Sequence, residues 1–169
     1  MINYLALPNR YPGLEKMAKF IGPYFPKCKY YVEPFAGLAR TAKYSRSEIM
    51  VLNDKSEYSN YYCQKNYHKA IVQNMDFIET IKKYDSKNTF FLIDPPWRID
   101  FYQGRGMTAR NKKGITAGFI DRPAKQYLID LQQILPALKG HYIVTLPTNF
   151  SCRKAKGKIF FDSPFSKKL

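Results

Sequence analysis

The sequence lacks the features that mark several common classes of protein. It has three scattered cysteines, Cys28, Cys63 and Cys152, with no CxxC pair, and its two histidines lie far from any cysteine cluster. This scarcity argues against a structural zinc site and against a disulfide framework, and it favours a reducing compartment. We therefore expect a cytoplasmic protein without a bound metal.

Long apolar runs are also missing. No stretch of eighteen apolar residues occurs, so we expect no transmembrane helix and no membrane partner. The first residues, MINYLALPNRYPG, lack the basic start and apolar run of a secretory signal. No internal repeat or low-complexity tract is visible, and the length suits one domain, so we expect a single catalytic domain over residues 1–169.

Acidic residues are few in comparison with basic ones. The chain has 28 lysines and arginines against 13 aspartates and glutamates, which gives a net charge of +15. Such an excess favours a polyanionic partner, most simply nucleic acid, because neutralising phosphates releases condensed counterions. A solubility role for the lysines is the ordinary alternative.

The pattern that is present alternates between strands and helices. Continuous or alternating apolar segments predict strands at 29–35, 49–54, 70–77, 89–94, 141–146 and 159–161. Helical spacing predicts helices at 14–25, 38–46, 56–68 with Ser56 as the cap, 78–84 and 123–138. This alternation is typical of an α/β three-layer sandwich with a mostly parallel sheet.

Four of the expected strands end in residues suited to a ligand, and parallel sheets bind ligands at that edge. Gly37 and its small neighbours allow a close backbone approach, and Asp54 follows at the offset of a ribose-binding acid. Asp76 and Phe77 end the third strand, and Asp94 ends the fourth. Each residue alone has an ordinary explanation as a turn, a helix cap or a core side chain. Their order and spacing together favour a nucleotide-like cofactor.

A long basic loop, residues 98–122, follows directly after the fourth strand and its DPPW sequence. It contains four glycines, and a loop of this length in a compact domain is usually functional or disordered. We expect it to form a mobile nucleic-acid clamp. Its expected contacts are Arg98, Arg105, Arg110, Lys112 and Lys113.

Five motifs together resemble those of a known enzyme family. They are RYPGLEK (10–16), YVEPFAGLART (31–41), LNDKSEY (52–58), NMDF (74–77) and DPPW (94–97). In this order they resemble the Dam-like N6-adenine DNA methyltransferases, which use S-adenosylmethionine, in a compact form without the target-recognition domain. The resemblance implies a Rossmann-like methyltransferase fold. It also implies a site-specific, adenine-specific enzyme that methylates the N6 amine of adenine in DNA.

The resemblance also implies roles for individual residues. The implied cofactor-binding residues are Tyr11, Lys16, Glu33, Pro34, Phe35, Ala36, Gly37, Asp54, Asp76 and Phe77. Among these, Asp54 would hold the ribose hydroxyls, and Asp76 and Phe77 the adenine of the cofactor. The implied catalytic residues are Asp94, Pro95, Pro96 and Trp97.

The DPPW tetrapeptide suits an exocyclic amine in physical terms. The Asp94 side chain and the Pro95 carbonyl can each accept an N–H from the amine, which favours a localised nitrogen lone pair. Trp97 offers a face on which an unstacked base can lie, a contact worth about 1–3 kcal/mol.

The chain departs from the family pattern in ways that leave alternatives open. Ala39 replaces a glycine of the first motif, which we interpret as a mild change because alanine still permits close packing. Family members insert a recognition domain between the third and fourth motifs, where this chain has only a short segment. Adenine methylation in RNA is therefore one alternative. A non-catalytic nucleic-acid-binding protein on a methyltransferase scaffold is another.

Overall fold

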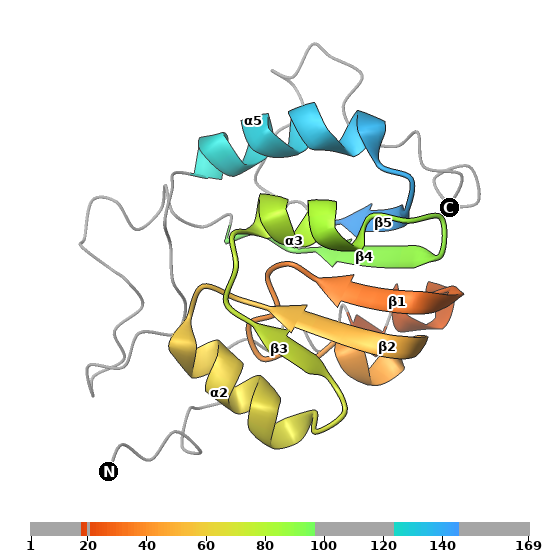
Figure 1. Ribbon diagram of the computed structural model, residues 1–169, viewed down its shortest axis with the longest axis vertical. Coiled ribbons are helices and arrows are strands. Elements are labelled where there is room, and N and C mark those ends of the chain that lie inside the picture. Colours follow the sequence, from red (N-terminus) through yellow and green to blue (C-terminus); the bar gives the residue numbers. More distant parts are fainter. Residues whose placement is uncertain (1–17, 20, 97–123, 146–169) are drawn as a thin grey trace.

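A five-stranded parallel sheet forms the centre of the structure (Figure 1). The computed structural model describes residues 18–19, 21–96 and 124–145. The strands are β1 (Lys27–Glu33), β2 (Arg46–Asn53), β3 (Ile71–Gln73), β4 (Thr89–Ile93) and β5 (His141–Val144). Their order is β3-β2-β1-β4-β5, and every neighbouring pair is parallel. This order is that of a doubly wound, Rossmann-like sheet, whose switch point lies between β1 and β4. The α/β prediction is confirmed.

The strands are increasingly buried toward their carboxyl ends. β1 and β2 begin with exposed residues and end in three buried ones each, and all five residues of β4 are buried. A continuously apolar central strand is typical of a parallel sheet covered on both faces. The carboxyl edge of the sheet is therefore well shielded from water, whereas the starts of β1 and β2 are not.

Helices cover both faces of the sheet and make three layers. One face carries α3 (Phe77–Tyr84), α5 (Ala124–Ile134) and the short 3-10 helix η5 (Leu135–Ala137). The opposite face packs against α2 (Glu57–Asn66) and the region of the 3-10 helices η2 (Gly22–Tyr24) and η3 (Ala42–Tyr44). Successive strand residues serve opposite faces, as the pleat requires: Val32 belongs to the first core and Tyr31 to the second.

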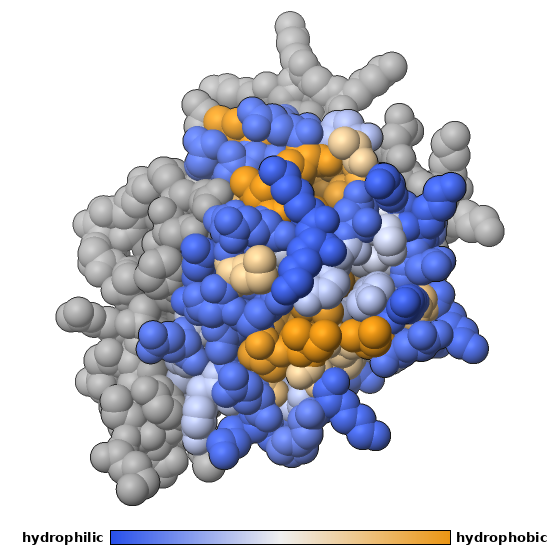
Figure 2. Space-filling view, viewed as in Figure 1, coloured by the Kyte–Doolittle hydropathy of each residue, from blue (hydrophilic) through white to orange (hydrophobic). Residues whose placement is uncertain are grey.

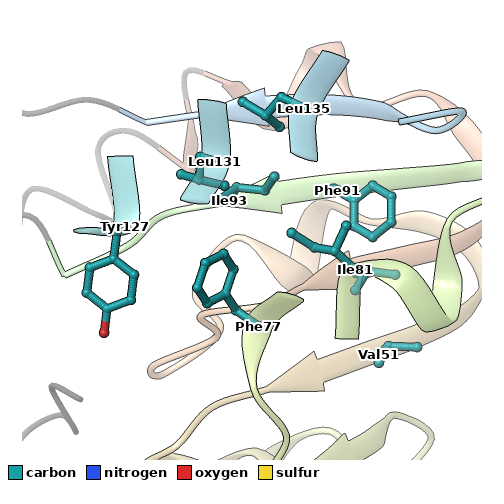
Figure 3. Close-up of a cluster of buried hydrophobic side chains, with 9 residues drawn as sticks. Val51, Phe77, Ile81, Phe91, Ile93, Tyr127, Leu131 and Leu135 are labelled. Carbon is teal, nitrogen blue, oxygen red and sulfur yellow. The ribbon is translucent and has the colours of Figure 1, made fainter. Parts of the chain in front are cut away.

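The core beneath α3 and α5 contains apolar residues at helical spacing, in the segment where a helix was expected over 123–138. Tyr127, Leu131 and Leu135 point from α5 and η5 toward the sheet, where they meet Phe77 and Ile81 of α3 (Figure 3). The spacing of the three residues places them on one side of a helix. Their burial fixes α5 above the end of β4.

Two helices begin at side-chain caps. The Ser56 hydroxyl accepts a hydrogen bond from Ser59 N at 3.3 Å and caps α2, as predicted. The Asp76 carboxylate accepts one from Ile78 N at 2.9 Å and caps α3. The predicted strand over 70–77 is therefore too long. It ends at Gln73, because Met75 bonds to the Asn53 side chain and Asp76 already belongs to the helix start.

The helix expected over 38–46 is wrong. Only the three residues of η3 are helical there, and β2 already begins at Arg46. Gly37 and Ala39 have φ values of 51° and 47°, and residues in this left-handed region interrupt a right-handed helix. The segment is consequently a loop that contains one short 3-10 helix.

Several predictions fall outside the described residues. These are the start of the helix at 14–25, the loop at 98–122, the strand at 159–161, and the span of the domain as a whole. Among the helices that the structure describes, none combines the length and the apolar character needed to cross a membrane.

Candidate functional site

Three carboxylates meet at the carboxyl edge of the sheet, beside the switch point. Glu33 ends β1, Asp54 follows β2, and Asp94 follows β4. These strands are adjacent in the order β2-β1-β4, and the charges of Asp94 and Asp54 both raise the pKa of Glu33. The site therefore has a concentrated negative potential, in contrast to the positive charge of the whole chain.

Glu33 is held rigidly inside this group. Its Oε1 accepts hydrogen bonds from the Tyr31 hydroxyl at 2.5 Å and the Thr41 hydroxyl at 2.6 Å, and the residue is 3% exposed. Burial raises the pKa of Glu33 to about 7, although the two hydrogen bonds oppose the rise. A nearby cation would favour the ionised form of Glu33 and would itself be stabilised.

Asn53 connects the ends of three strands. Its Nδ2 donates to the carbonyls of Pro34 at 3.0 Å and Met75 at 3.1 Å, and its Oδ1 accepts from Met75 N at 2.8 Å. Its backbone carbonyl accepts from Ala36 N at 2.8 Å. Because Asn53 is 1% exposed, the buried amide is paired on both sides and fixes the segment after β1 to the segment after β3.

Asp54 holds the loop after β1 against the start of α2. Its Oδ2 accepts from Gly37 N and its Oδ1 from Ser56 N, each at 2.8 Å. Burial raises the pKa of Asp54, and these two hydrogen bonds work in the opposite direction. Each carboxylate oxygen has a second lone pair. The side chain thus holds the loop in place and still has lone pairs that could accept further hydrogen bonds.

Cys63 of α2 and Tyr67, which follows this helix, also bond to the loop after β1. The Tyr67 hydroxyl donates to the Ala39 carbonyl at 2.5 Å, and the Cys63 thiol donates to the Gly37 carbonyl at 3.6 Å. Burial raises the pKa of Cys63 to about 12, with further rises from the charges of Glu33 and Asp54. Cys63 is therefore a protonated donor and not a nucleophile.

Among the described residues, the loop has open space at Gly37. A Cβ built on this glycine meets no heavy atom of the described ranges within 4 Å, although φ is 51°. Ala39, two residues later, adopts φ of 47° and is 1% exposed. We expected that replacing glycine by Ala39 would matter only for close packing, and this expectation is incomplete. The position also requires a left-handed backbone, which costs alanine about 1–2 kcal/mol.

Asp94 is positioned from the neighbouring edge strand. The Thr145 hydroxyl donates to Asp94 Oδ1, and Thr145 N donates to the Ile93 carbonyl at 3.0 Å. Burial raises the pKa of Asp94, and the hydrogen bond from Thr145 lowers it. Within the described part of the chain Asp94 receives no second hydrogen bond. Its Oδ2 can therefore accept one from a substrate, beside the buried Pro95.

Asp76 and Phe77 have clear structural roles. Asp76 caps α3, and Phe77 is 3% exposed within the core. The Phe77 ring lies 4.8 Å from that of Phe35 and 5.7 Å from that of Tyr127, measured between centroids. Asp76 therefore acts as a helix cap and Phe77 as a core residue, which are the ordinary explanations that the sequence offered for each residue taken singly. Their contact with a cofactor adenine stays a prediction.

The structure brings together four of the predicted site residues, Glu33, Gly37, Asp54 and Asp94. Pro34, Phe35 and Ala36 lie on the same loop, and Pro96 follows Pro95. Predicted residues outside the described ranges are Tyr11, Lys16, Trp97, Arg98, Arg105, Arg110, Lys112 and Lys113.

Several side chains that support the site were not predicted from the sequence. They are Tyr31, Thr41, Asn53, Cys63, Tyr67 and Thr145. Thr145 follows β5 and Asn53 ends β2, so the strand-end rule could have identified both. The other four bond to the loop or to Glu33 from positions with no distinctive local pattern.

The three carboxylates do not form a metal site of the usual kind. Across residues 18–19, 21–96 and 124–145, no group of three or more His, Cys, Asp or Glu side chains has an arrangement that could hold a metal ion.

No family model matches the sequence, and no curated protein does either. One similar solved structure is described as "conserved hypothetical protein" from Streptococcus pyogenes, with 22% identity and a TM-score of 0.40 over 50% of this chain and 57% of that one. Another is described as "Putative methyltransferase yhhF from Escherichia coli", with 17% identity and a TM-score of 0.40 over 56% of each chain.

This chain therefore spans less than two thirds of the length of either similar structure. TM-scores of 0.40 are too low to support a shared fold, so the fold assignment depends on the strand order observed in this chain.

Proposed function

We propose that this protein transfers a methyl group from S-adenosylmethionine to the exocyclic N6 amine of adenine in DNA. One observation supports the proposal most directly. Asp94, after β4, lies close to Glu33 at the end of β1 and to the open loop at Gly37, and the switch point of the sheet lies between these two strands. One side of this edge suits a cationic cofactor, and the other presents a carboxylate and a proline carbonyl to a substrate.

The residues on the cofactor side fit S-adenosylmethionine. When bound, this cofactor supplies a methyl group attached to a positively charged sulfur. Glu33 and Asp54 give the negative potential that a sulfonium and an ammonium group require, since opposite charges attract strongly in a poorly solvated site. The open space at Gly37 allows the ligand to lie against the backbone, and Asp54 retains lone pairs for the ribose hydroxyls.

Asp94 and Pro95 would activate and orient the target amine. The lone pair of an adenine amine is delocalised into the ring, so the amine is a weak nucleophile. Hydrogen bonds from its two N–H groups to Asp94 Oδ2 and the Pro95 carbonyl favour a localised lone pair. Thr145 holds Asp94 Oδ1 and so fixes the direction of the other oxygen. Holding the two reactants in register supplies much of the rate.

The choice of adenine in DNA has separate support. It comes from the resemblance of EPFAG and DPPW to the Dam-like family and from the net charge of +15. Trp97 would stack on the flipped base, and the basic residues of 98–122 would contact its backbone. Both are proposals about residues outside the described ranges.

A transfer assay tests the proposal. The full-length protein is incubated with cofactor labelled on its methyl group and with duplex DNA, single-stranded DNA or RNA, and the labelled base is identified after digestion. N6-methyladenine in DNA is expected, and Asp94→Ala should abolish it while leaving cofactor affinity nearly intact. Asp130→Ala, on the surface of α5, is the matched control and should be active.

Two outcomes would count against the proposal. Label in RNA alone would favour the RNA alternative. Saturable cofactor binding without transfer to any of the three nucleic acids would argue against a catalytic role in nucleic-acid methylation.

A further inference from the structure

Basic residues mark the start of every strand of the sheet. Lys27 begins β1 and Arg46 begins β2, while Lys69, Lys87 and Lys139 each come two residues before β3, β4 and β5. Lys29 follows on β1. All six side chains are exposed. We name these six residues the amino edge.

The strand register places the amino edge in one row. Lys27 lies opposite Arg46 in adjacent strands. Lys87 precedes Thr89, which pairs with Tyr30, so it lies near the level of Cys28. The pairing of β5 with β4 places Lys139 near the level of Lys29, and the pairing of β3 with β2 places Lys69 near the level of Tyr30. All of these positions lie within about three residues, roughly 10 Å, of Lys27 along the strand direction.

Five strands at about 4.8 Å spacing make a row about 19 Å long. In Figure 1 the strands start at the right of the view, and Figure 2 shows mostly hydrophilic residues along that side.

Among the described residues, few acids interrupt the row. Glu48 is exposed on β2, one residue beyond the paired Cys28 and Ser47, and Asp85 accepts hydrogen bonds from the backbone of Lys139 and Gly140 at 2.9 Å. Within the described ranges, none of the six basic side chains of the amino edge forms an ion pair. Acids gather instead at the other end of the same strands, so the sheet separates charge along its strands.

Two ordinary explanations do not account for this row. A lysine-rich composition places exposed lysines elsewhere too, as on α2 and α3, but it does not predict a basic residue at or just before the start of all five described strands. Favourable interaction with helix dipoles acts within the last helical turn, whereas Lys69 lies beyond the end of α2 and Lys87 beyond the end of α3. Lys27 and Arg46 follow 3-10 helices of only three residues, which have little dipole.

We propose that the amino edge is a second nucleic-acid-binding surface, which contacts the phosphate backbone without reading its sequence. The row is long enough to span several phosphates, since duplex DNA carries one charge per about 1.7 Å of axis. On β1, Lys27 lies six residues, about 20 Å, from Glu33, and Lys29 lies four residues, about 13 Å, from it. The edge therefore binds a different stretch of nucleic acid from the one that enters the site at Asp94. The inference rests on nucleic acid as the partner in the proposed function, but not on methyl transfer.

Binding measured without cofactor tests this surface. The triple variant Lys27→Gln, Arg46→Gln, Lys87→Gln removes three charges from the central strands of the row. The matched control, Lys65→Gln, Lys82→Gln, Lys83→Gln, removes three exposed charges from α2 and α3. Fluorescence anisotropy of a labelled duplex at several salt concentrations gives the dissociation constant and its salt slope.

The edge variant should lower the slope of log affinity against log salt by roughly 2 to 3 and weaken binding at least tenfold at low salt. The control should change the slope much less. Equal losses in the two variants would overturn the proposal, because net charge alone would explain them. Wild-type duplex binding in the edge variant, together with loss of binding to phosphatidylserine vesicles, would also overturn it and identify a membrane surface.

The assay follows binding alone, so its result is independent of the transfer assay. An inactive protein whose duplex binding depends on the amino edge would refute the proposed function and leave this surface standing.

Discussion

At the scale of single residues, the loop after β1 depends on two residues with left-handed backbone, Gly37 and Ala39. Their surroundings differ. Gly37 borders open space, whereas Ala39 is buried and its carbonyl is bonded to Tyr67. Ala39 demonstrates that this loop can hold a Cβ at positive φ. A methyl group at Gly37 should therefore be tolerated by the fold and act mainly on whatever occupies the open space.

Gly37→Ala should lower the free energy of unfolding by about 1–2 kcal/mol, the cost of a left-handed alanine. It should weaken S-adenosylmethionine binding more than tenfold, because the added methyl enters the proposed ligand volume. Ala39→Gly is the control, since it changes the same loop without filling that volume. Calorimetric affinities equal to wild type in both variants would place the cofactor elsewhere.

The free energy of unfolding should depend on pH through Glu33, and the sign of this dependence follows from the burial of its carboxyl group. Its pKa rises from 4.5 to about 7 on folding, so the folded state binds more protons between these values. Its contribution to stability is present below pH 4.5 and is lost as pH rises through about 7. Glu33→Gln keeps an acceptor for Tyr31 and Thr41 and removes the charge.

The Glu33→Gln protein should be more stable than wild type at pH 8 by about 1–3 kcal/mol and nearly equal at pH 4.5. Urea unfolding across this range measures the difference. Cofactor affinity should rise with pH through about 7 in the wild type and stay flat in the variant. A variant less stable than wild type at pH 8 would mean that the ionised carboxylate stabilises the fold.

At the scale of elements, the ends of the strands are joined by side chains from their neighbours. Asn53 of β2 fixes the segments after β1 and β3, and Thr145 after β5 fixes Asp94 after β4. These bonds run across the sheet edge, so the geometry of the site depends on the strand order and not on one loop.

Asn53→Ala should lower the free energy of unfolding by roughly 2–4 kcal/mol, because it leaves buried groups of Pro34 and Met75 unpaired. Asn66→Ala is the matched control, since Asn66 makes a single exposed bond to Tyr62. It should cost less than about 0.5 kcal/mol. Equal urea midpoints for the two variants would contradict the role given to Asn53.

Thr145→Val should reduce the turnover of the proposed transfer by about tenfold to a hundredfold, the value of a hydrogen bond to a charged group. Because this bond lowers the pKa of Asp94, its loss should also move the acidic limb of the pH–rate profile to higher pH. Thr145→Ser should restore both properties. A fall in turnover with an unchanged profile would indicate a structural effect alone.

At the scale of the whole molecule, charge is distributed unevenly along the sheet. Carboxylates gather where the strands end, and exposed lysines and arginine lie where they start. The acidic edge is buried and suits a small cation, and the basic edge is exposed and suits a polyanion. The net charge of +15 still acts on the protein as a whole through self-repulsion.

Sodium chloride should therefore stabilise the free protein. Screening becomes effective above about 0.1 M, where the Debye length falls to about 10 Å. The urea midpoint should rise with salt and then level off, and potassium chloride should give the same curve. A midpoint that falls over this range would mean that favourable charge pairs outweigh the repulsion.

The sequence by itself determined the α/β class, because the continuous apolar run of β4 and the stripe on α5 are local patterns that only one layered arrangement can bury. It also placed Gly37, Asp54 and Asp94 together, since residues that follow parallel strands must lie at one edge of the sheet. Only the tertiary structure decided that the segment after Gly37 is a loop, that Glu33 is shielded enough to titrate near pH 7, and that Thr145 supports Asp94. These features depend on contacts between residues distant in the chain, such as Asn53 with Pro34 and Met75, and local periodicity contains no information about such contacts.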